Sequence, residues 1–441
     1  MAERADVAVV GARVAGSAAA IAFARAGLRV VALDRVTFPA DTISTHLLWP
    51  AGLAELKRLG VLERVEAVGA PRMPVATTEG CGHLVRGDFS PVEGVDYAMC
   101  VRRPGLDAAL VAGAREAGAE VRERVRVTDL VRDGGRVAGV RFVDHDGREG
   151  ELRAALTIGA DGRRSTVAGL AGAAVPYKGR TSGRACFFAY WRDGQDEQRH
   201  VAAQWREGEE LAAAFPCDDG LVLVLLQTPV ARTAEFRADL RGTYERTVAA
   251  IPGLARRLQG CEPVSKVRAA TDIQSYFRRA SGPGWALAGD AAHFKDPVTA
   301  QGIRDGLRYA RLLAEAAAPV LDDAAALDRT ASAWERRLAC ECIEVYQWTD
   351  RLARGDAMTP LEAELYRQAA ADPSLATALL DVFSRLNSPS EFLSPARAAA
   401  LAGRALARPA GDRRRVLASA GAELRTALAD LRERRAVHER G

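Results

Sequence analysis

The chain has 441 residues, of which 48% are hydrophobic and 27% charged, so it holds enough apolar material for a large folded core. At roughly 150 residues per domain, this length predicts two or three domains. The net charge of +4 comes from 61 basic and 57 acidic residues. This nearly even balance of charge argues against a nucleic-acid partner. The seven cysteines include no Cys-x-x-Cys pair, so we expect reduced thiols, no metal site and a cytoplasmic protein.

The N-terminus and the longest apolar stretch lack the signals of export or membrane insertion. The chain enters a predicted strand at once, and the apolar stretch 15–31 is interrupted by Arg25 and Arg29. We therefore expect neither a signal peptide nor a transmembrane helix.

The N-terminal part alternates between strand and helix patterns. Apolar runs at 6–10 and 28–33 flank an Ala-rich stretch with helical spacing at 17–26. A β-α-β unit of this kind predicts an α/β fold with a parallel sheet. Further helices are predicted at 50–59 and 106–117, each closed by a glycine.

Strand patterns dominate the middle of the chain. Predicted strands at 120–130, 136–144 and 151–159 are joined as hairpins by the turn residues Asp133-Gly134-Gly135 and Asp146-Gly147. Apolar runs within 178–275 then predict a second, sheet-rich domain, to which 75–98 is joined. These runs lie at 185–191, 200–205, 210–215 and 221–227.

One face of this second sheet is a candidate lining for a substrate cavity. It is expected to carry Phe187, Tyr190, Gln204 and Phe215, although plain core packing explains the same residues equally well. From Gly302 onward the chain is predicted to be helical. Its Ala- and Arg-rich end, from Pro395, is expected to form peripheral helices that fray after about Arg435.

A glycine-containing turn joins the first strand to the first helix. The sequence Gly11-Ala12-Arg13-Val14-Ala15-Gly16 follows a Gly-x-Gly-x-x-Gly pattern with Arg13 at the middle glycine. Gly11 permits the tight turn and Gly16 lets the helix pack closely, so that the N–H groups of the helix start face a pyrophosphate. Asp34, 23 residues after Gly11, ends the second strand and can accept hydrogen bonds from a ribose. Arg35 beside it is grouped with these cofactor-binding residues.

Three later segments narrow the class of nucleotide. Arg102-Arg103-Pro104-Gly105-Leu106-Asp107 opens a helix, and Gly159-Ala160-Asp161-Gly162 follows a strand. The segment from Ala288 to Gly302 contains Gly289-Asp290, His293, Pro297 and Gln301-Gly302 before another helix. In this order the segments resemble the FAD-dependent aromatic-hydroxylase superfamily, typified by p-hydroxybenzoate hydroxylase. Flavin-dependent halogenases and geranylgeranyl reductases are its wider relatives.

The resemblance implies a role for each matching residue. Gly11, Gly16 and Arg13 lie at the pyrophosphate of FAD, Asp34 at the adenosine ribose, and Arg103 near the ribose and phosphate. Asp161 and Gly162 lie near the pyrophosphate and the reduced nicotinamide. Asp290 holds the ribityl chain, Pro297 lies beside the isoalloxazine ring, and Gln301-Gly302 approaches its pyrimidine end. Arg13 and Ala300 depart from the family pattern, in which glycine is common at both positions.

The resemblance also implies a Rossmann-like FAD-binding domain at 1–74, 99–177 and 276–330. The substrate-binding sheet domain then comprises 75–98 and 178–275, and 331–441 forms a helical C-terminal region. Only one glycine-rich turn of this type is present, so NAD(P)H is expected to bind transiently. A homodimer is a further possibility.

The reaction is inferred by elimination within the superfamily. Halogenases carry a Trp-x-Trp-x-Ile-Pro segment and a catalytic lysine, and geranylgeranyl reductases carry a Cys-Gly pair near position 45; both sequence segments are absent. We therefore expect a monooxygenase that uses NAD(P)H and O2 to hydroxylate or epoxidise a small aromatic or polyketide-like substrate through a C4a-hydroperoxyflavin. A flavin-dependent reductase and an FAD-bearing maturation factor that modifies a partner protein are the alternatives.

Two histidines are candidate proton-transfer groups, with Pro297 as the third residue assigned to catalysis. His46 follows the second strand, and His293 lies in the same segment as Asp290. An imidazole with an ordinary pKa near 6.5 can move a proton at neutral pH. A purely structural role is the alternative for each. Lys295 is either a solvated loop charge or an electrostatic aid to the flavin.

Overall fold

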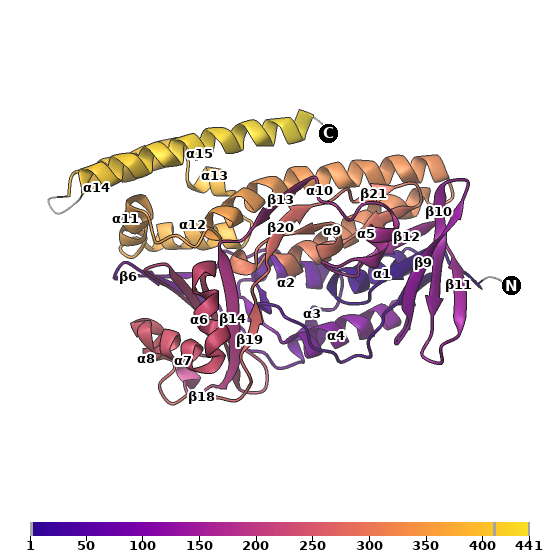
Figure 1. The fold of residues 1–441 in the computed structure, drawn as a ribbon, viewed down its shortest axis with the longest axis horizontal. Coiled ribbons are helices and arrows are strands. Elements are labelled where there is room, and N and C mark those ends of the chain that lie inside the picture. The colour runs from indigo at the N-terminus through magenta and orange to yellow at the C-terminus, as the bar shows by residue number, and fades with distance from the viewer. Residues whose placement is uncertain (1–2, 409–411, 440–441) are drawn as a thin grey trace.

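The computed structural model describes residues 3–408 and 412–439. A six-stranded sheet forms the centre of its N-terminal half (Figure 1). Neighbouring strands pair in parallel except at one edge, where β21 pairs antiparallel with β22. The strands, in spatial order, are β21 (Ser281–Gly282), β22 (Trp285–Leu287), β12 (Leu156–Gly159), β2 (Val7–Val10), β3 (Val30–Leu33) and β8 (Glu120–Arg122). The α/β class and the parallel sheet are therefore confirmed.

Helices and a smaller sheet bury the central strands, which explains why β2 and β3 are apolar along their whole length. Helix α1 (Val14–Arg25) packs against α4 (Arg103–Glu116) and α9 (Gly302–Ala317). The shorter helices α2 (Pro50–Arg58) and α3 (Leu62–Glu66) pack on α9 and α4 in this layer, whereas α5 (Thr166–Leu170) packs on β12 and the smaller sheet. Small strand pairs link it to the rest of the molecule: β4 (Leu47–Leu48) with β7 (Met99–Cys100), and β20 (Gln274–Phe277) with both β13 (Lys178–Thr181) and β23 (His293–Phe294).

The smaller sheet corrects two predicted strands. It comprises β1 (Glu3–Arg4), β11 (Glu149–Arg153), β10 (Arg136–Val143) and β9 (Arg126–Asp133), with the predicted hairpin turns between β9, β10 and β11. The predicted strand 120–130 is in fact β8 and β9, which lie in different sheets because Arg124 adopts a left-handed conformation (φ +59°) between them. The predicted strand 151–159 is likewise divided into β11 and β12. The chain therefore passes from the six-stranded sheet to the smaller sheet after β8 and returns to the six-stranded sheet at β12.

A second large sheet lies beside the first (Figure 1). It contains β18 (Glu262–Pro263), β14 (Arg184–Arg192), β17 (Leu221–Pro229), β16 (Glu210–Pro216), β15 (Val201–Glu207), β5 (Val75–Gly80), β6 (His83–Asp88) and, beside β14, β19 (Arg268–Ala270). Three short helices pack on one face: α6 (Thr233–Ala238), α7 (Leu240–Ala250) and α8 (Pro252–Arg257). The sequence analysis did not predict these helices, which are each eleven residues or shorter.

Alternation along β14 separates two residues that were expected to share a face. Phe187 stacks on Phe236 of α6, with ring centroids 3.8 Å apart, and so belongs to the helix-covered face. Phe188, Tyr190 and, from β16, Phe215 point to the opposite face, toward the first sheet. The expectation that Phe187 lines the same cavity as Tyr190 is therefore wrong, because their odd spacing puts them on opposite sides of a strand.

The C-terminal helices bridge the two sheets. They are α10 (Ala324–Leu352), α11 (Pro360–Ala369), α12 (Pro373–Phe383), α13 (Pro389–Phe392), α14 (Pro395–Leu406) and α15 (Arg413–Glu439). Helices α11 and α12 pack on β6, and α10 packs on α9. Helix α15 continues through Glu439, so the predicted fraying after Arg435 is wrong for the residues up to this point; 440–441 lie outside the described residues. Among the described residues, no helix is long and apolar enough to cross a bilayer.

Candidate flavin site

The first β-α turn is closed tightly on itself. Gly11 has φ +94°, and a Cβ built on Gly16 would lie 1.7 Å from the Gly11 carbonyl oxygen. No side chain caps the start of α1, where Arg13 is the N-cap residue. The N–H groups of the first helical turn are therefore left for a ligand, and the positive end of the helix dipole favours an anion there.

Asp34 ties the second strand to this turn. Its carboxylate accepts hydrogen bonds from the Ala12 amide at 2.7 Å and the Val36 amide at 3.0 Å. Each carboxylate oxygen accepts a single one of these bonds, so lone pairs remain for ribose hydroxyls. Asp34 thus fits its expected position at the end of β3. Arg35 beside it is exposed.

Arg13 points away from the turn, toward a buried carboxylate on α4. Asp107 is completely buried, and its Oδ2 pairs with Arg13, while Arg103 donates to Oδ1 at 2.8 Å and to Oδ2 at 3.0 Å. Arg13 also donates to the Ala40 carbonyl oxygen at 3.0 Å. The arginine at a position where relatives carry glycine is therefore accommodated by a salt bridge. Asp107 is a site residue that the sequence analysis quoted without assigning it a role.

The segment after β12 lies directly against the first turn. A Cβ on Gly11 would lie 2.5 Å from the Ala160 carbonyl oxygen. The carboxylate of Asp161 accepts bonds from Ser165 Oγ at 2.5 Å and the Thr166 amide at 2.7 Å, and so caps α5. Gly162 (φ +82°) has open space where a side chain would lie. Asp161 is thus held structurally at the edge of the site, and its expected contact with nicotinamide stays a prediction.

The segment from Gly289 to Gly302 closes the site from the third side. A Cβ on Gly289 (φ +59°) would lie 2.7 Å from the Ala15 Cβ, and one on Gly302 would meet only Asp290 Oδ1, at 3.9 Å. Burial raises the pKa of Asp290, although Arg163 and Arg103 oppose the shift. Its carboxylate accepts no hydrogen bond within the described part of the chain, which suits a residue that holds a hydroxylated ligand chain.

The loop before α9 is held by side chains from distant helices. Trp49 Nε1 donates to the Thr299 carbonyl oxygen at 3.0 Å, and Gln301 Nε2 donates to the Phe383 carbonyl oxygen at 2.9 Å. Pro297 begins a single 3-10 turn that ends at Ala300, whose φ of +52° is left-handed. Ala300 therefore adopts a conformation that favours glycine, at a cost of about 1–2 kcal/mol.

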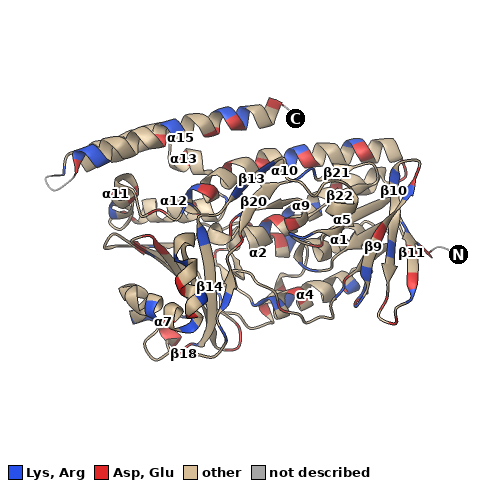
Figure 2. Cartoon of the chain, in the orientation of Figure 1, with Lys and Arg blue, Asp and Glu red and all other residues tan. Residues whose placement is uncertain are grey.

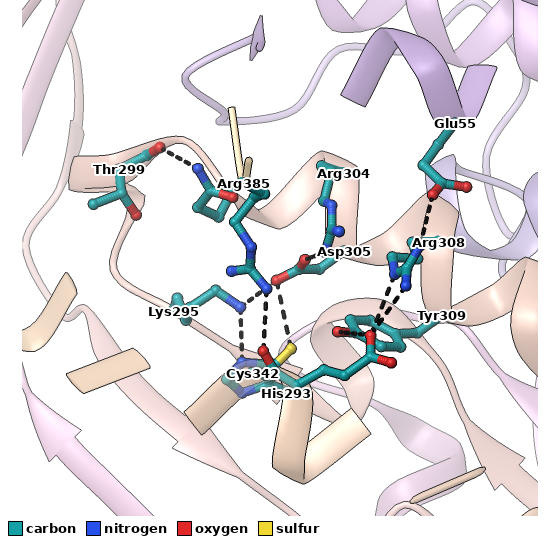
Figure 3. Close-up of polar contacts among 12 residues, drawn as sticks. Glu55, His293, Lys295, Thr299, Arg304, Asp305, Arg308, Tyr309, Cys342 and Arg385 are labelled. Carbon is teal, nitrogen blue, oxygen red and sulfur yellow. Dashed lines mark hydrogen bonds and ion pairs between the residues drawn. The ribbon is translucent and has the colours of Figure 1, made fainter. Parts of the chain in front are cut away.

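His293 and Lys295 belong to a buried charge cluster under this loop (Figure 3). His293 bonds through Nδ1 to the Tyr276 carbonyl oxygen and through Nε2 to Lys295 Nζ, both at 2.8 Å. Lys295 also pairs with Asp305, whose pKa is lowered because Lys295, Arg385 and Arg304 outweigh its burial. Lys295 is thus not a solvated loop charge.

The contacts of His293 favour the structural alternative for this residue. Both ring nitrogens are engaged, the ring stacks on Phe277 at 3.8 Å, and burial followed by Lys295 lowers its pKa. A role for His293 in proton transfer stays a prediction. His293, Asp305 and Cys342 also form a possible set of metal ligands, but Lys295 already supplies the cation to two of them.

His46 has a different environment, between the two sheets. It is fully buried with φ +59°, and its Nε2 lies 2.7 Å from the hydroxyl of Tyr190. Its Nδ1 is buried without a hydrogen-bond partner among the described residues. Burial, and next Arg103, lowers the pKa of His46 to about 3, so the ring is neutral at pH 7. Arg103 acts on Asp290 as well, so this arginine connects the histidine to the third side of the site.

Tyr190 was expected to line a substrate cavity, but its pairing with His46 was not predicted. It lies on the inward face of β14 beside Phe188, and burial raises the pKa of its hydroxyl. Side chains along β14 alternate between the two faces of the sheet, and this alternation places Tyr190 on the face toward the first sheet. No pattern in the sequence indicates that His46 lies beside it.

The expected segments lie close to one another. The glycine turn is bonded to Asp34 and lies against the segment from Gly159 to Gly162, Arg103 acts on the pKa of Asp290, and open space adjoins Gly162 and Gly302. Free helix N–H groups at one end and an unpartnered carboxylate further along fit a dinucleotide with a polyhydroxylated chain. This arrangement is that of a flavoprotein with a nucleotide-binding sheet.

Comparison with known proteins places the chain in a family. A family model described as an FAD binding domain matches residues 4–349, and the chain belongs to this family. It is an enzyme of the flavin oxidoreductase class, with FAD as its cofactor. It is 30% identical over 327 residues to menaquinone reductase of Mycolicibacterium smegmatis, covering 71% of this chain and 76% of the relative. It is 29% identical over 359 residues to digeranylgeranylglycerophospholipid reductase 2 of Methanopyrus kandleri, covering 75% and 82%.

Solved structures share the fold at lower identity. The myxobacterial chondrochloren halogenase CndH superposes with a TM-score of 0.71 at 22% identity, covering 88% of this chain and 99% of that chain. PqsL, a probable FAD-dependent monooxygenase from Pseudomonas aeruginosa, gives 0.63 at 21% identity, covering 86% and 99%. Reductases, halogenases and a monooxygenase thus share this architecture.

We expect Gly16→Ala to weaken FAD binding at least tenfold, because the new Cβ would collide with the Gly11 carbonyl and push α1 away. Titration of the apoprotein with FAD, followed by flavin absorbance, measures the dissociation constant. Gly169→Ala is the matched control, since a Cβ added to this glycine of α5 would lie in open space. Unchanged affinity in Gly16→Ala would contradict the placement of the pyrophosphate.

We expect His46 to make the fold less stable as the pH falls. Its pKa drops from an ordinary 6.5 to about 3 on folding, so between these values the unfolded chain binds a proton that the folded chain does not. The unfolding free energy should fall by about 1.4 kcal/mol per pH unit from this residue. Denaturant unfolding at pH 6.5 to 4 should show a shallower slope for His46→Gln than for wild type. His200→Gln, at an exposed position, should keep the wild-type slope.

Proposed function

We propose that this flavoenzyme is a monooxygenase that hydroxylates or epoxidises a small aromatic or polyketide-like substrate, with NAD(P)H as transient reductant and O2 as co-substrate. The observation that carries the proposal is the His46–Tyr190 pair, whose Nδ1 is buried without a hydrogen-bond partner among the described residues, beside an apolar face that Arg102 borders. Bound FAD would supply the redox chemistry, by accepting a hydride equivalent and passing electrons to O2.

The apolar face suits a reaction that must exclude water. Phe188, Phe215 and Leu225 surround Tyr190 on the inward side of the second sheet, and His46 packs edge-on against Phe188. An aromatic substrate against this face would be desolvated, which limits wasteful loss of reducing equivalents.

The histidine suits the orientation of a phenolic substrate. The His46 ring is neutral, so Nδ1 can accept a hydrogen bond from a substrate hydroxyl when Nε2 carries the ring proton and donates it to the Tyr190 oxygen. Tyr190 stays protonated, since burial raises its pKa, and its contact with Nε2 fixes the orientation of the imidazole. The residues that would hold FAD are Gly11, Gly16, Asp34, Arg103, Asp290 and Gly302.

Halogenation is less well supported, because the lysines lie elsewhere. Lys57 donates to the Glu93 carbonyl oxygen at the surface, Lys178 pairs with Glu433, and Lys266 is exposed. Lys295 is paired with Asp305 under the loop. None of the four faces the His46–Tyr190 pair, whereas the halogenase resemblance requires a lysine at the substrate.

Reduction of a carbon–carbon double bond is the second candidate. The two reductases named above are 30% and 29% identical to this chain, against 21% for the monooxygenase PqsL. Saturation of a double bond needs a proton as well as a hydride equivalent, and the buried Tyr190 hydroxyl is the group that would supply this proton. Modification of a partner protein is less well supported, because both residues are buried. A homodimer and a cytoplasmic location stay predictions from the sequence.

We expect 18O from 18O2 in the product when the purified, yellow protein turns over substrates from an aromatic panel with NAD(P)H. Mass spectrometry of products and oxygen uptake measure this outcome. Turnover without added substrate is the control for uncoupled oxidation. A saturated product formed anaerobically, with no label under 18O2, would overturn oxygenation in favour of reduction.

We expect Tyr190→Phe to lower kcat on the order of tenfold to a hundredfold while FAD affinity stays unchanged. The variant keeps the ring but loses the hydroxyl that orients His46. Steady-state kinetics with the substrate identified above and FAD titration separate the two effects. Tyr244→Phe is the matched control, since its hydroxyl bonds the Val224 carbonyl oxygen on the helix-covered face. Equal losses in both variants would show a structural effect only.

A further inference from the structure

Helix α15 forms the outer edge of the C-terminal region. Its 27 residues span about 40 Å, and it lies along α10 as a straight rod at the top of Figure 1. A rod parallel to the molecular surface presents its whole outward side to a flat partner. The distribution of charged and apolar residues around this helix is uneven.

The acidic residues of α15 face inward. Arg351 of α10 donates to Glu423 at 3.1 Å and lies 3.7 Å from Asp430. Gln347 donates to Glu433 at 2.8 Å, and Lys178 pairs with the same residue. These contacts consume three of the four acidic side chains of the helix and attach it to the rest of the molecule.

The outward side combines exposed leucines with exposed arginines. The leucines at 417, 424, 428 and 431 are 60%, 58%, 48% and 40% exposed, and their spacing of seven, four and three residues places them in one stripe. Figure 2 shows basic residues in blue along the same helix. The exposed arginines are Arg413, Arg414, Arg415, Arg425, Arg432 and Arg435.

The outward side has almost no acidic residue to balance these charges. Within the described part of α15, Glu439 at the C-terminal end is the one exposed acid, and Asp412 precedes the helix. The outward side of the helix therefore carries a leucine stripe with arginines beside it. Exposed leucines next to arginines are the side chains by which helices lie in the headgroup region of a membrane.

We propose that α15 docks the enzyme on the surface of an anionic lipid bilayer. The four leucines enter the boundary between headgroups and acyl chains, and the arginines extend along the surface to lipid phosphates. The helix lies flat on the bilayer and does not cross it. This docking is independent of the reaction proposed above, and would place the enzyme where apolar substrates dissolve.

Charge argues against the same stripe pairing with a second copy of the chain. Two α15 helices packed antiparallel through their leucines would bring Arg425 and Arg432 of one copy near the same arginines of the other, and a parallel pair would bring Arg435 near the other copy's Arg435. Like charges beside a helix seam destabilise it. An anionic surface compensates the arginines beside the stripe instead.

The test uses the FAD-loaded full chain and sedimentation with vesicles. We expect it to sediment with phosphatidylcholine vesicles that contain phosphatidylglycerol, and not with pure phosphatidylcholine vesicles. High salt should weaken the binding. The double variant Arg425→Glu/Arg432→Glu should bind at least tenfold more weakly, since each basic residue near an anionic surface contributes about fivefold to the binding constant. The double variant Leu424→Ser/Leu428→Ser should also bind at least tenfold more weakly, because it removes two apolar side chains from the stripe.

A matched control and an independent readout keep the outcome decisive. Arg126→Glu/Arg237→Glu reverses the same amount of charge at exposed positions on β9 and α6, and should retain binding. Flavin absorbance and the mass in solution are measured for every variant. Failure of the wild type to bind anionic vesicles would overturn the proposal, as would equal loss in the control. Conversion of a dimer to a monomer by the leucine variant, without vesicle binding by the wild type, would assign the stripe to a second copy.

Discussion

The close approach of α1 to its neighbours is the constraint on which the rest of the structure depends. Gly16 lets the helix start touch the Gly11 carbonyl, and Gly289 lets the later segment reach the Ala15 Cβ. Backbone contacts this short leave no room for side chains, so each segment is fixed relative to the others. The proposed dinucleotide site depends on this packing, because it lies between segments whose positions relative to one another are fixed.

Buried charge is the second constraint, and it reaches beyond the nucleotide-binding sheet. Asp107 is bracketed by Arg13 and Arg103, so the turn and α4 are joined through one completely buried carboxylate. Removal of either arginine would leave that carboxylate partly uncompensated, which costs several kcal/mol in a buried site. The arginine in the glycine pattern is thus part of a charge system and not a defect in it.

The sequence predicted the parts of the fold that are set by local pattern. The glycine turn, Asp34 and the β-α-β unit follow from periodicity and turn chemistry, and the structure confirms the fold class they indicate. The strand at 120–130 was wrong because a β-prone run says nothing of the left-handed Arg124 that divides it. Such a break depends on tertiary contacts, here the bond from the Val125 amide to the Asp34 carbonyl.

Candidate site residues could be predicted where a sequence motif marks them. They could not be predicted where residues far apart in the sequence come together only in the folded structure. Asp290 was identified from its neighbours in sequence, whereas the partner of His46 lies 144 residues away on another sheet. The role of Lys295 stayed open in the sequence, because its counter-charge Asp305 and the second cation beside that carboxylate, Arg385, are brought together only by folding. Long-range charge pairing carries no periodic signal in a single sequence.

The C-terminal helices are therefore part of the flavin site and more than a cover. Arg385 acts on Asp305 below the loop, and the Phe383 carbonyl accepts the Gln301 amide within it. Both groups lie at the end of α12, so a shift of this helix would disturb the charge balance and the loop together. Helix α15 is attached to α10, which also packs on α9. A continuous set of packed helices thus connects the outer surface with the loop that precedes α9.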